Sequence, residues 1–204
     1  MIGVVAGVGP YAGLDLLSKI LAQTDAEKDQ DHLTVASLSQ PALIADRSSF
    51  LLGQTKTNPA LAIIEQLLKL EQIGAVVAGI PCNTAHAPAI FDRIRQGLAD
   101  AGSELNLLHM IAAVASDLQL VHPQVKKVGV LATTGTILTR IYPRILDPLG
   151  VETLVVDQEQ QAQLIQPALY DAHYGIKACG YATARARDNL VSGARQLEKM
   201  GAQA

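Results

Sequence analysis

The sequence predicts an α/β fold built on parallel sheets. Short apolar runs of strand length alternate along the chain with segments of helical periodicity, an order typical of βαβ units with right-handed crossovers. The first run, residues 2–6, is apolar throughout, as in a strand that is buried on both faces. Hydrophobic residues make up 49% of the 204 residues and charged residues 17%, a composition that excludes a disordered chain.

The N-terminal segment is expected to hold two strands and a helix. After the strand at 2–6, glycines surround Pro10, and the spacing of the leucines between residues 14 and 21 predicts a helix. Residues 33–38 are predicted as the second strand.

The next helix is predicted to begin at Asn58-Pro59, where a cap residue precedes a proline at the first helical position, and to end at Gly74. One face of this helix is expected to consist of Leu61, Ile64, Leu68 and Glu71. The remaining strands are expected within 75–80, 105–111, 127–132 and 152–156.

The chain also resembles itself. Residues 2–9 can be laid over residues 128–135 with four identities, which predicts two similar α/β lobes at 1–110 and 111–204, unless two ordinary βα units match by coincidence. In this repeat Gly74-Ala75 corresponds to Gly201-Ala202. The counterpart of position 82 falls near 209, so the first lobe is expected to lack a final strand and helix in this sequence.

Composition and charge argue against several classes of function. Aromatic residues are 3% with no Trp, and the net charge is −3 without a basic block, so neither base stacking nor electrostatics supports nucleic-acid binding. No apolar run approaches the roughly 18–20 residues of a membrane span. Two cysteines without metal-ligand spacing predict neither a disulfide framework nor a metal site. We therefore expect a cytoplasmic protein with no membrane or nucleic-acid partner.

Cys82 is the residue most indicative of chemistry. It follows a predicted buried strand and precedes a helix, at the sheet edge where α/β proteins bind ligands. The positive end of a helix favours a thiolate, and free N–H groups of its first turn can hold a carboxylate. The alternative is a small buried cysteine that fills a strand end, but the polar neighbours Asn83 and Thr84 would be poor core residues. His86 is expected to be an early helix residue or a polar neighbour of Cys82, and a direct catalytic role is the alternative.

Two cations are candidates for binding a substrate carboxylate. Arg47 could bind it bidentately with Asp46 as its orienting partner, and Lys177 could add a second positive contact. Surface ion pairs and solvated lysines are the ordinary alternatives.

Two strand ends supply further polar groups. Thr133, Thr134, Gly135 and Thr136 offer hydroxyls and backbone N–H groups, and the same residues could equally form a helix cap. The Gly7–Gly13 turn is not a convincing dinucleotide fingerprint, because its third glycine is displaced, and no Walker sequence occurs.

These segments together resemble one family, the cofactor-independent aspartate/glutamate racemases, and within it the aspartate racemase branch. The resemblance covers essentially the whole chain in order. It rests on Pro81–His86, Ile44–Ser48, Gly129–Thr136 and Tyr174–Ala178. It implies two flavodoxin-like lobes with parallel sheets, related by a pseudo-twofold axis, with the active site in the cleft between them, and commonly a homodimer.

The resemblance also implies roles for individual residues. Inverting an α-carbon without a cofactor takes a thiolate and a thiol on opposite faces of the substrate, and Cys82 would be one of this pair. The residues expected to bind the acidic amino acid are Gly9, Arg47, Asn83, Thr84, Thr134, Gly135, Thr136 and Lys177. Among them, Arg47 and Lys177 would hold the side-chain carboxylate.

The sequence departs from the family pattern at three places. The second cysteine of the family follows a helix that ends in Gly-Ala, and this sequence stops shortly after Gly201-Ala202. Cys179 lies two residues past Lys177 rather than at a strand end, and Gly13 and Ala45 replace residues that are usual in the family.

The function expected is therefore interconversion of L- and D-aspartate, with glutamate as another substrate, by two-base thiol chemistry. A single-cysteine isomerase or decarboxylase of the same superfamily, similar to maleate isomerase, is the first alternative. A catalytically inactive binder of acidic amino acids is the second.

Overall fold

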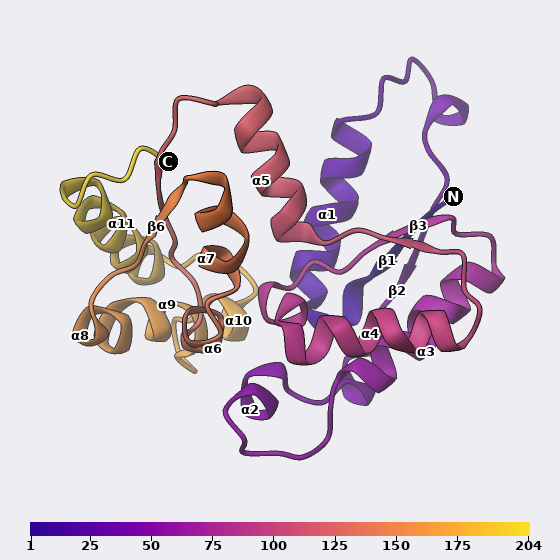
Figure 1. Ribbon diagram of the computed structural model, residues 1–204, viewed down its shortest axis with the longest axis horizontal. Coiled ribbons are helices and arrows are strands. Elements are labelled where there is room, and N and C mark those ends of the chain that lie inside the picture. The colour runs from indigo at the N-terminus through magenta and orange to yellow at the C-terminus, as the bar shows by residue number, and fades with distance from the viewer. The chain divides into compact units, whose positions relative to one another are not determined.

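Four parallel strands form the sheet of the first of two units, Met1–Ala113 and Val114–Ala204, into which the chain divides (Figure 1). The computed structural model describes residues 1–204. The strand order is β2-β1-β3-β4, with all neighbours parallel. The bounds are β1 (Ile2–Val5), β2 (Val35–Leu38), β3 (Val77–Gly79) and β4 (Asn106–Leu107). All four strands thus end at the same edge of the sheet, where their following loops meet.

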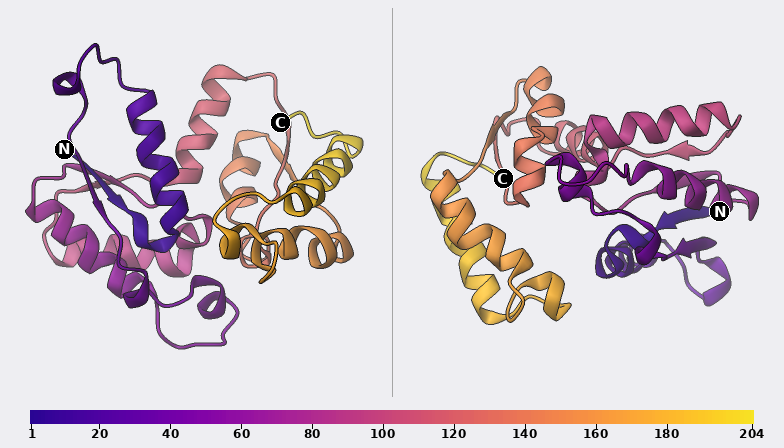
Figure 2. Two further views of the ribbon diagram at one scale, coloured as in Figure 1. Left: turned by 180° about the vertical axis from the view of Figure 1, so that it is seen from behind. Right: turned by 90° about the horizontal axis from the view of Figure 1, so that it is seen from below.

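Helices cover both faces of this sheet. Helix α1 (Pro10–Ala22) lies on one face, and α3 (Ala60–Gln72) and α4 (Pro88–Asp100) lie on the other (Figure 2). Helix α5 (Met110–Val121) runs through the division between the two units. The shorter turns of this unit are α2 (Arg47–Leu51) and the 3-10 turns Ala6–Val8, Asp29–Asp31, Pro41–Leu43 and Asn83–His86.

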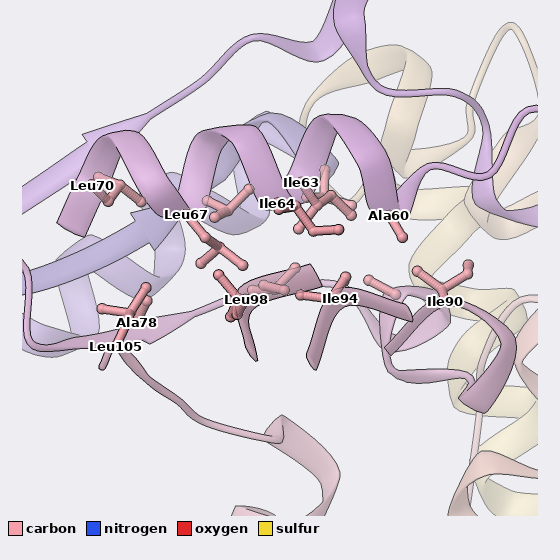
Figure 3. Close-up of a cluster of buried hydrophobic side chains, with 14 of the residues drawn as sticks. Ala60, Ile63, Ile64, Leu67, Leu70, Ala78, Ile90, Ile94, Leu98 and Leu105 are labelled. Carbon is pink, nitrogen blue, oxygen red and sulfur yellow. The ribbon is translucent and has the colours of Figure 1, made fainter. Parts of the chain in front are cut away.

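The main hydrophobic core lies between the sheet and the α3–α4 layer (Figure 3). Helices α3 and α4 face each other through Ile63, Leu67, Ile90 and Ile94, all of them fully buried. Each such side chain stabilises the fold by about 1.5–3 kcal/mol relative to leaving it exposed. This core lies directly beneath the residues that follow β3.

The predicted face of α3 overlaps the buried face but is not centred on it. Ile64 is buried and Leu68 half-buried, as predicted, but Leu61 is 51% exposed. The centre of the buried face is formed by Ile63, Leu67 and Leu70. The helix packs against both the sheet and α4, so its buried face is wider than a single stripe and is centred away from Leu61. The predicted ends are confirmed, because the Asn58 Oδ1 atom accepts the Ala60 N–H at 2.9 Å and Gly74 adopts φ +100° just after the helix.

Helix α1 is confirmed, and both a leucine and a glycine join it to the unit. Leu16 is half-buried, with its Cδ2 atom 3.7 Å from where a Cβ atom on Gly79 of β3 would lie, whereas Leu14 is 62% exposed. The only fully buried residue of the helix is Gly13. A Cβ atom on Gly13 would lie 2.4 Å from the Cβ atom of Ala6, so only glycine permits this close approach of helix and strand end. This requirement accounts for a glycine at position 13.

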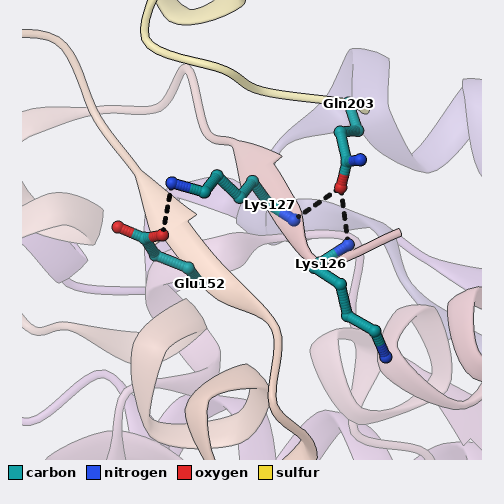
Figure 4. A network of polar contacts seen from close by, with 4 residues as sticks. All are labelled: Lys126, Lys127, Glu152 and Gln203. Carbon is teal, nitrogen blue, oxygen red and sulfur yellow. Dashed lines mark hydrogen bonds and ion pairs between the residues drawn. The ribbon is translucent and has the colours of Figure 1, made fainter. Parts of the chain in front are cut away.

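The second unit contains a parallel pair, β5 (Lys127–Gly129) and β6 (Glu152–Leu154). The last residues extend this sheet on the free side of β5, since the Gln203 N–H donates to the Lys127 carbonyl at 2.9 Å and the Gly129 N–H donates to the Ala204 carbonyl at 2.7 Å. Figure 4 shows the side chain of Gln203, which accepts the backbone N–H groups of Lys126 and Lys127, and the Lys127–Glu152 ion pair. The hydrogen bonds of Gln203 and Ala204 hold the tail against β5, and the ion pair joins β5 to β6.

Helices and short turns make up the rest of the second unit. They are α6 (Thr134–Leu138), α7 (Ile141–Leu146), a 3-10 turn (Asp147–Leu149), α8 (Gln158–Gln160), a π-helical turn (Gln161–Ile165), α9 (Gln166–Tyr170), α10 (Ile176–Cys179) and α11 (Ala184–Lys199). Ile165 and Leu197 pack with β6 in one small core, and Ala115, Leu146 and Val151 form a second.

The two units repeat one packing arrangement. A Cβ atom on Gly3 would meet the Cβ atoms of Ala75 and Leu70 at 3.2 and 3.3 Å, and one on Gly129 would meet those of Ala202 and Leu197 at 3.2 and 3.1 Å. The helices before these alanines end alike, because Gly74 has φ +100° and Gly201 has φ +98°. The order β2-β1-β3 in the first unit therefore corresponds to β6-β5-tail in the second. This arrangement supports the internal repeat over coincidence.

The predicted α/β fold with parallel sheets is confirmed. A strand lies within each of the six apolar runs, shorter than the run in every case. The largest difference is at 105–111, where β4 ends at Leu107 and Met110 already begins α5.

A stability prediction follows from Gln66. This residue of α3 is only 1% exposed, and neither its Oε1 nor its Nε2 atom has a hydrogen-bond partner. A buried polar group without a partner costs about 1–3 kcal/mol. We therefore expect Gln66→Met, which keeps the unbranched shape, to raise the free energy of unfolding by about 1–2 kcal/mol in urea denaturation. Leu67→Ala, at the next position, should lower it by about 2–5 kcal/mol, and a Gln66→Met protein less stable than the wild type would contradict this account.

Candidate active site

Three loops meet at the carboxyl edge of the first unit's sheet. A Cβ atom on Gly7, after β1, would lie 2.7 Å from the backbone N of Gln40, after β2. One on Gly9 would lie 3.9 Å from the carbonyl oxygen of Pro81, after β3. The first of these distances is too short for any side chain, so glycine at position 7 brings the loops after β1 and β2 into contact.

Cys82 lies at this edge, in the loop after β3. Its backbone is extended, and it immediately precedes the 3-10 turn Asn83–His86. The Sγ atom is 3.2 Å from the Oγ1 atom of Thr84, and the side chain is half-buried. A thiol in this position is accessible yet held by a hydroxyl partner.

The helix that follows Cys82 differs from the prediction. The sequence indicated a helix directly after the cysteine, whereas the structure has a single 3-10 turn and α4 begins only at Pro88. Pro88 occupies the first position of α4, and the Ala87 residue before it is extended, as the residue before a proline generally is. Within the 3-10 turn the Thr84 side chain is buried and that of Asn83 is half-buried.

Arg47 joins the loops after β1 and β2. It is the first residue of α2, whose cap is Asp46, with the Asp46 Oδ1 atom accepting the Ser49 N–H at 2.7 Å. The Nη2 atom of Arg47 donates to the Val8 carbonyl at 2.7 Å, and its buried Nε atom has no hydrogen-bond partner. The guanidinium thus lies beside the Gly7–Gly9 turn rather than pointing away into solvent.

Burial keeps the ring of His86 neutral. Its Nδ1 atom is 2.8 Å from the Cys82 carbonyl, and only 1% of the residue is exposed. Burial lowers the pKa of His86 from the usual 6.5 to about 4, and His109 adds to this, whereas the hydrogen-bonded Cys82 carbonyl and the Leu108 carbonyl oppose it. Burial also lowers the pKa of His109.

In the second unit, the loop after β5 is braced by two glutamines. The Thr133 hydroxyl caps α6 by accepting the Thr136 N–H at 3.3 Å, and the buried Thr136 hydroxyl lies 3.1 Å from it. The Oε1 atom of Gln166 accepts both the N–H and the hydroxyl of Thr134, at 2.9 and 3.0 Å. Gln161 donates to the Ala132 carbonyl at 3.0 Å.

Gln161 is the first residue of a π-helical turn, and Gln166 directly follows that turn. Pro167 has no N–H to continue an α-helical ladder, and the turn before it, Gln161–Ile165, is widened to a π-helix. Neither glutamine was predicted as a site residue from the sequence. The available signal was Pro167 within an otherwise helical run, because such a proline marks an interrupted helix, and π-helical interruptions are frequent at functional sites.

Lys177 and Cys179 lie together on α10. The Nζ atom of Lys177 is 4.6 Å from the centre of the Tyr170 ring, and the lysine is otherwise exposed. The Cys179 Sγ atom is 3.5 Å from the His173 carbonyl. Tyr170 belongs to α9, the helix that also carries Gln166, so one short helix contacts both Lys177 and the Thr134 loop.

The expected site residues therefore form two groups, one in each unit. Gly9, Arg47, Cys82, Asn83 and Thr84 lie at the carboxyl edge of the first sheet. Thr134, Gly135 and Thr136 follow β5, and Lys177 lies beyond α9. No group of three or more His, Cys, Asp or Glu side chains is arranged to hold a metal ion.

Comparison with known proteins identifies the family. The family model described as Asp/Glu/hydantoin racemase matches residues 5–204. The chain belongs to the Asp/Glu/hydantoin racemase family. A broad-specificity amino-acid racemase of Bacillus subtilis, RacX, is 32% identical over 168 residues, which are 79% of this chain and 67% of that protein.

Solved structures of racemases share the fold of this family member. An aspartate racemase from Picrophilus torridus has a TM-score of 0.77 and 28% identity, over 97% of this chain and 76% of that one. An aspartate racemase homologue from Pyrococcus horikoshii has a TM-score of 0.71 and 20% identity, over 99% of this chain and 81% of that one. The predicted resemblance and the two-lobed flavodoxin-like fold class are thereby confirmed.

No helix of this racemase family member is both long enough and apolar enough to cross a membrane.

The buried histidine predicts a loss of stability in acid. Because the pKa of His86 is about 4 in the folded protein and about 6.5 in the unfolded chain, the unfolded chain takes up the proton first as the pH falls. Stability is thus retained above pH 6.5 and lost between pH 6.5 and 4, by up to about 3 kcal/mol. We expect the urea midpoint of the wild type to fall more steeply over this range than that of His86→Asn. Parallel pH profiles would contradict the assignment.

Proposed function

We propose that this protein interconverts the enantiomers of aspartate without a cofactor, and that Cys82 is one of its acid–base groups. The observation that carries the proposal is the half-buried Cys82 thiol at the carboxyl edge of the sheet, 3.2 Å from the Thr84 hydroxyl. Membership of a racemase family and similarity to an aspartate racemase structure support it.

The proposed chemistry is a proton transfer in two steps. A Cys82 thiolate removes the α-proton from one face of the amino acid, which forms the S–H bond and leaves a carbanion at the α-carbon. A proton then reaches the opposite face from a second acid, and in the reverse direction the Cys82 thiol donates. Asn83 and Thr84 follow Cys82 directly, and on the family resemblance we assign them to the α-amino and α-carboxylate groups.

Residues of the second unit are also proposed to bind the substrate. We assign Thr134, Gly135 and Thr136 to substrate contacts, with Gln166 holding Thr134 in place. Lys177 is assigned to the side-chain carboxylate together with Arg47. Positive groups of this kind also stabilise the negative charge that develops as the α-proton leaves.

The breadth of the substrate range forms a second proposal. The Nη2 atom of Arg47 donates to the Val8 carbonyl, and its Nη1 atom lies 3.5 Å from the Ala45 carbonyl. Part of the guanidinium therefore holds the loops after β1 and β2 together and is not available to a substrate carboxylate. A relative 32% identical is a broad-specificity racemase. These observations favour activity on further amino acids, including glutamate, at lower rates than on aspartate.

Isotope incorporation from heavy water tests the role of Cys82. The wild type with L-aspartate should yield D-aspartate deuterated at the α-carbon, and Cys82→Ser should lower that rate by about a hundredfold or more, because it removes a positioned acid–base group. Cys179→Ser is the matched control, since it removes the other cysteine, and should retain the activity. Nuclear magnetic resonance of the α-proton with chiral chromatography measures both quantities.

Each alternative predicts a different result in this experiment or in a direct assay of its own activity. Exchange of the α-proton with retained configuration would favour a one-base enzyme of the same superfamily. Conversion of maleate, or release of CO₂ from an acidic substrate, would favour the isomerase or decarboxylase. Binding without exchange, measured by calorimetry, would favour an inactive binder of acidic amino acids and reject the racemase proposal.

Substrate selectivity tests the role of Arg47. We expect Arg47→Ala to lower kcat/KM for aspartate by about a hundredfold, as for loss of a charge-assisted hydrogen bond worth roughly 1.5–3 kcal/mol. The loss for alanine and serine should be several times smaller, because those substrates have no side-chain carboxylate. Equal losses for all substrates would show that Arg47 only braces the loops.

A further inference from the structure

We propose that His86 is a positioning residue for Cys82, because its ring donates a hydrogen bond to the Cys82 carbonyl and packs against the rings of Phe91 and His109. This inference rests on the proposed function of Cys82. It assigns to His86 the task of fixing the turn from which the thiol projects.

The backbone of Cys82 is held on both sides. Its N–H donates to the Ile80 carbonyl at 2.8 Å, and its carbonyl accepts the Ala85 N–H at 3.2 Å. The Nδ1 atom of His86 lies 2.8 Å from the same carbonyl oxygen. A carbonyl can only accept, so Nδ1 is the protonated nitrogen of the neutral ring. Rotation of the peptide after Cys82 would break this bond, and the bond therefore restrains the direction of the Cα–Cβ bond that carries the thiol.

The ring of His86 is fixed by two other aromatic rings. It stacks on Phe91 of α4 with centroids 5.1 Å apart and an interplanar angle of 23°. His109 meets both rings edge-on, with centroid distances of 4.7 Å to His86 and 4.6 Å to Phe91. His109 directly precedes α5, so the Cys82 turn is tied to α4 and to the segment after β4.

His86 is unsuited to exchanging protons with a substrate. It is fully buried, and its Nε2 atom has no hydrogen-bond partner. The ionisable group that acts directly on it is His109, on which Asp92 and Arg95 in turn act with opposite effects. The pKa of His86, about 4, keeps the ring uncharged at neutral pH. Its contribution is therefore geometric, and small displacements of a catalytic group strongly reduce turnover.

Two substitutions separate the hydrogen bond from the volume of the ring. Asn at position 86 places an amide N–H close to the position of Nδ1, whereas Leu fills space without a donor. We expect His86→Leu to lower kcat for L-aspartate by about tenfold to a hundredfold with KM changed by less than about threefold. His86→Asn should recover most of kcat. Ile94→Val, a buried change elsewhere on α4, controls for lost stability and should keep kcat near that of the wild type.

The outcomes distinguish this inference from the proposed function. A Cys82→Ser protein that racemises aspartate at the wild-type rate would overturn the proposed function itself. A slowed Cys82→Ser protein together with wild-type kcat in His86→Leu would reject only the role of His86. Equal losses of kcat in His86→Leu and His86→Asn would also reject it, because the donor would then not matter.

A measurement on the wild type needs neither activity nor a variant that folds. In ¹⁵N spectra of protein labelled at histidine, the signals of one ring should show a proton on Nδ1 and none on Nε2. The chemical shifts of these signals should not change between pH 8 and 5.5. The signals of that ring should show contacts to an aromatic phenylalanine proton. If every histidine ring titrated near the usual value of about 6.5, or if the buried ring carried its proton on Nε2, the inference would be overturned.

Discussion

The packing of α3 and α4 on one face of the four-stranded sheet is the constraint on which the candidate site depends. Ile63, Leu67, Ile90 and Ile94 are fully buried in this layer. Helix α3 leads into β3 through Gly74, and α4 begins only six residues after Cys82. The core therefore fixes both ends of the segment that carries the cysteine. The short loop between them then needs only local hydrogen bonds to acquire one conformation.

Those local bonds come from an unusual set of groups. The Cys82 carbonyl accepts two hydrogen bonds, one from the backbone of Ala85 and one from His86. Neighbouring loops approach closely because Gly7 has no side chain, and Arg47 fixes the Val8 carbonyl from the next loop. Preorganisation of this kind lowers the cost of arranging catalytic groups when a substrate binds. The same contacts that pack the loops at the sheet edge thus also fix the positions of the candidate site residues.

Much of this fold could be predicted from the sequence. The alternation of apolar runs and helices fixed the class, and the match of residues 2–9 with residues 128–135 indicated two similar units. Gly3 and Gly129 have similar surroundings, which explains why that match exists. Each glycine leaves room for the helix that precedes the next segment of its sheet, β3 in the first unit and the tail in the second. The centre of the buried face of α3 could not be predicted. It depends on the packing against α4, a partner that periodicity within α3 does not reveal.

The candidate site was predictable only in part. Cys82 stood out because a polar cluster followed a buried strand, but the bond from His86 and the contacts of Gln166 depend on residues that meet only in the folded chain. The central claim is that Cys82 exchanges the α-proton on one face only. Primary isotope effects with α-deuterated L- and D-aspartate test this most directly in the wild type and Cys82→Ser. We predict that the substitution raises the isotope effect for one enantiomer alone, and an equal change for both enantiomers, or no change, would contradict the account.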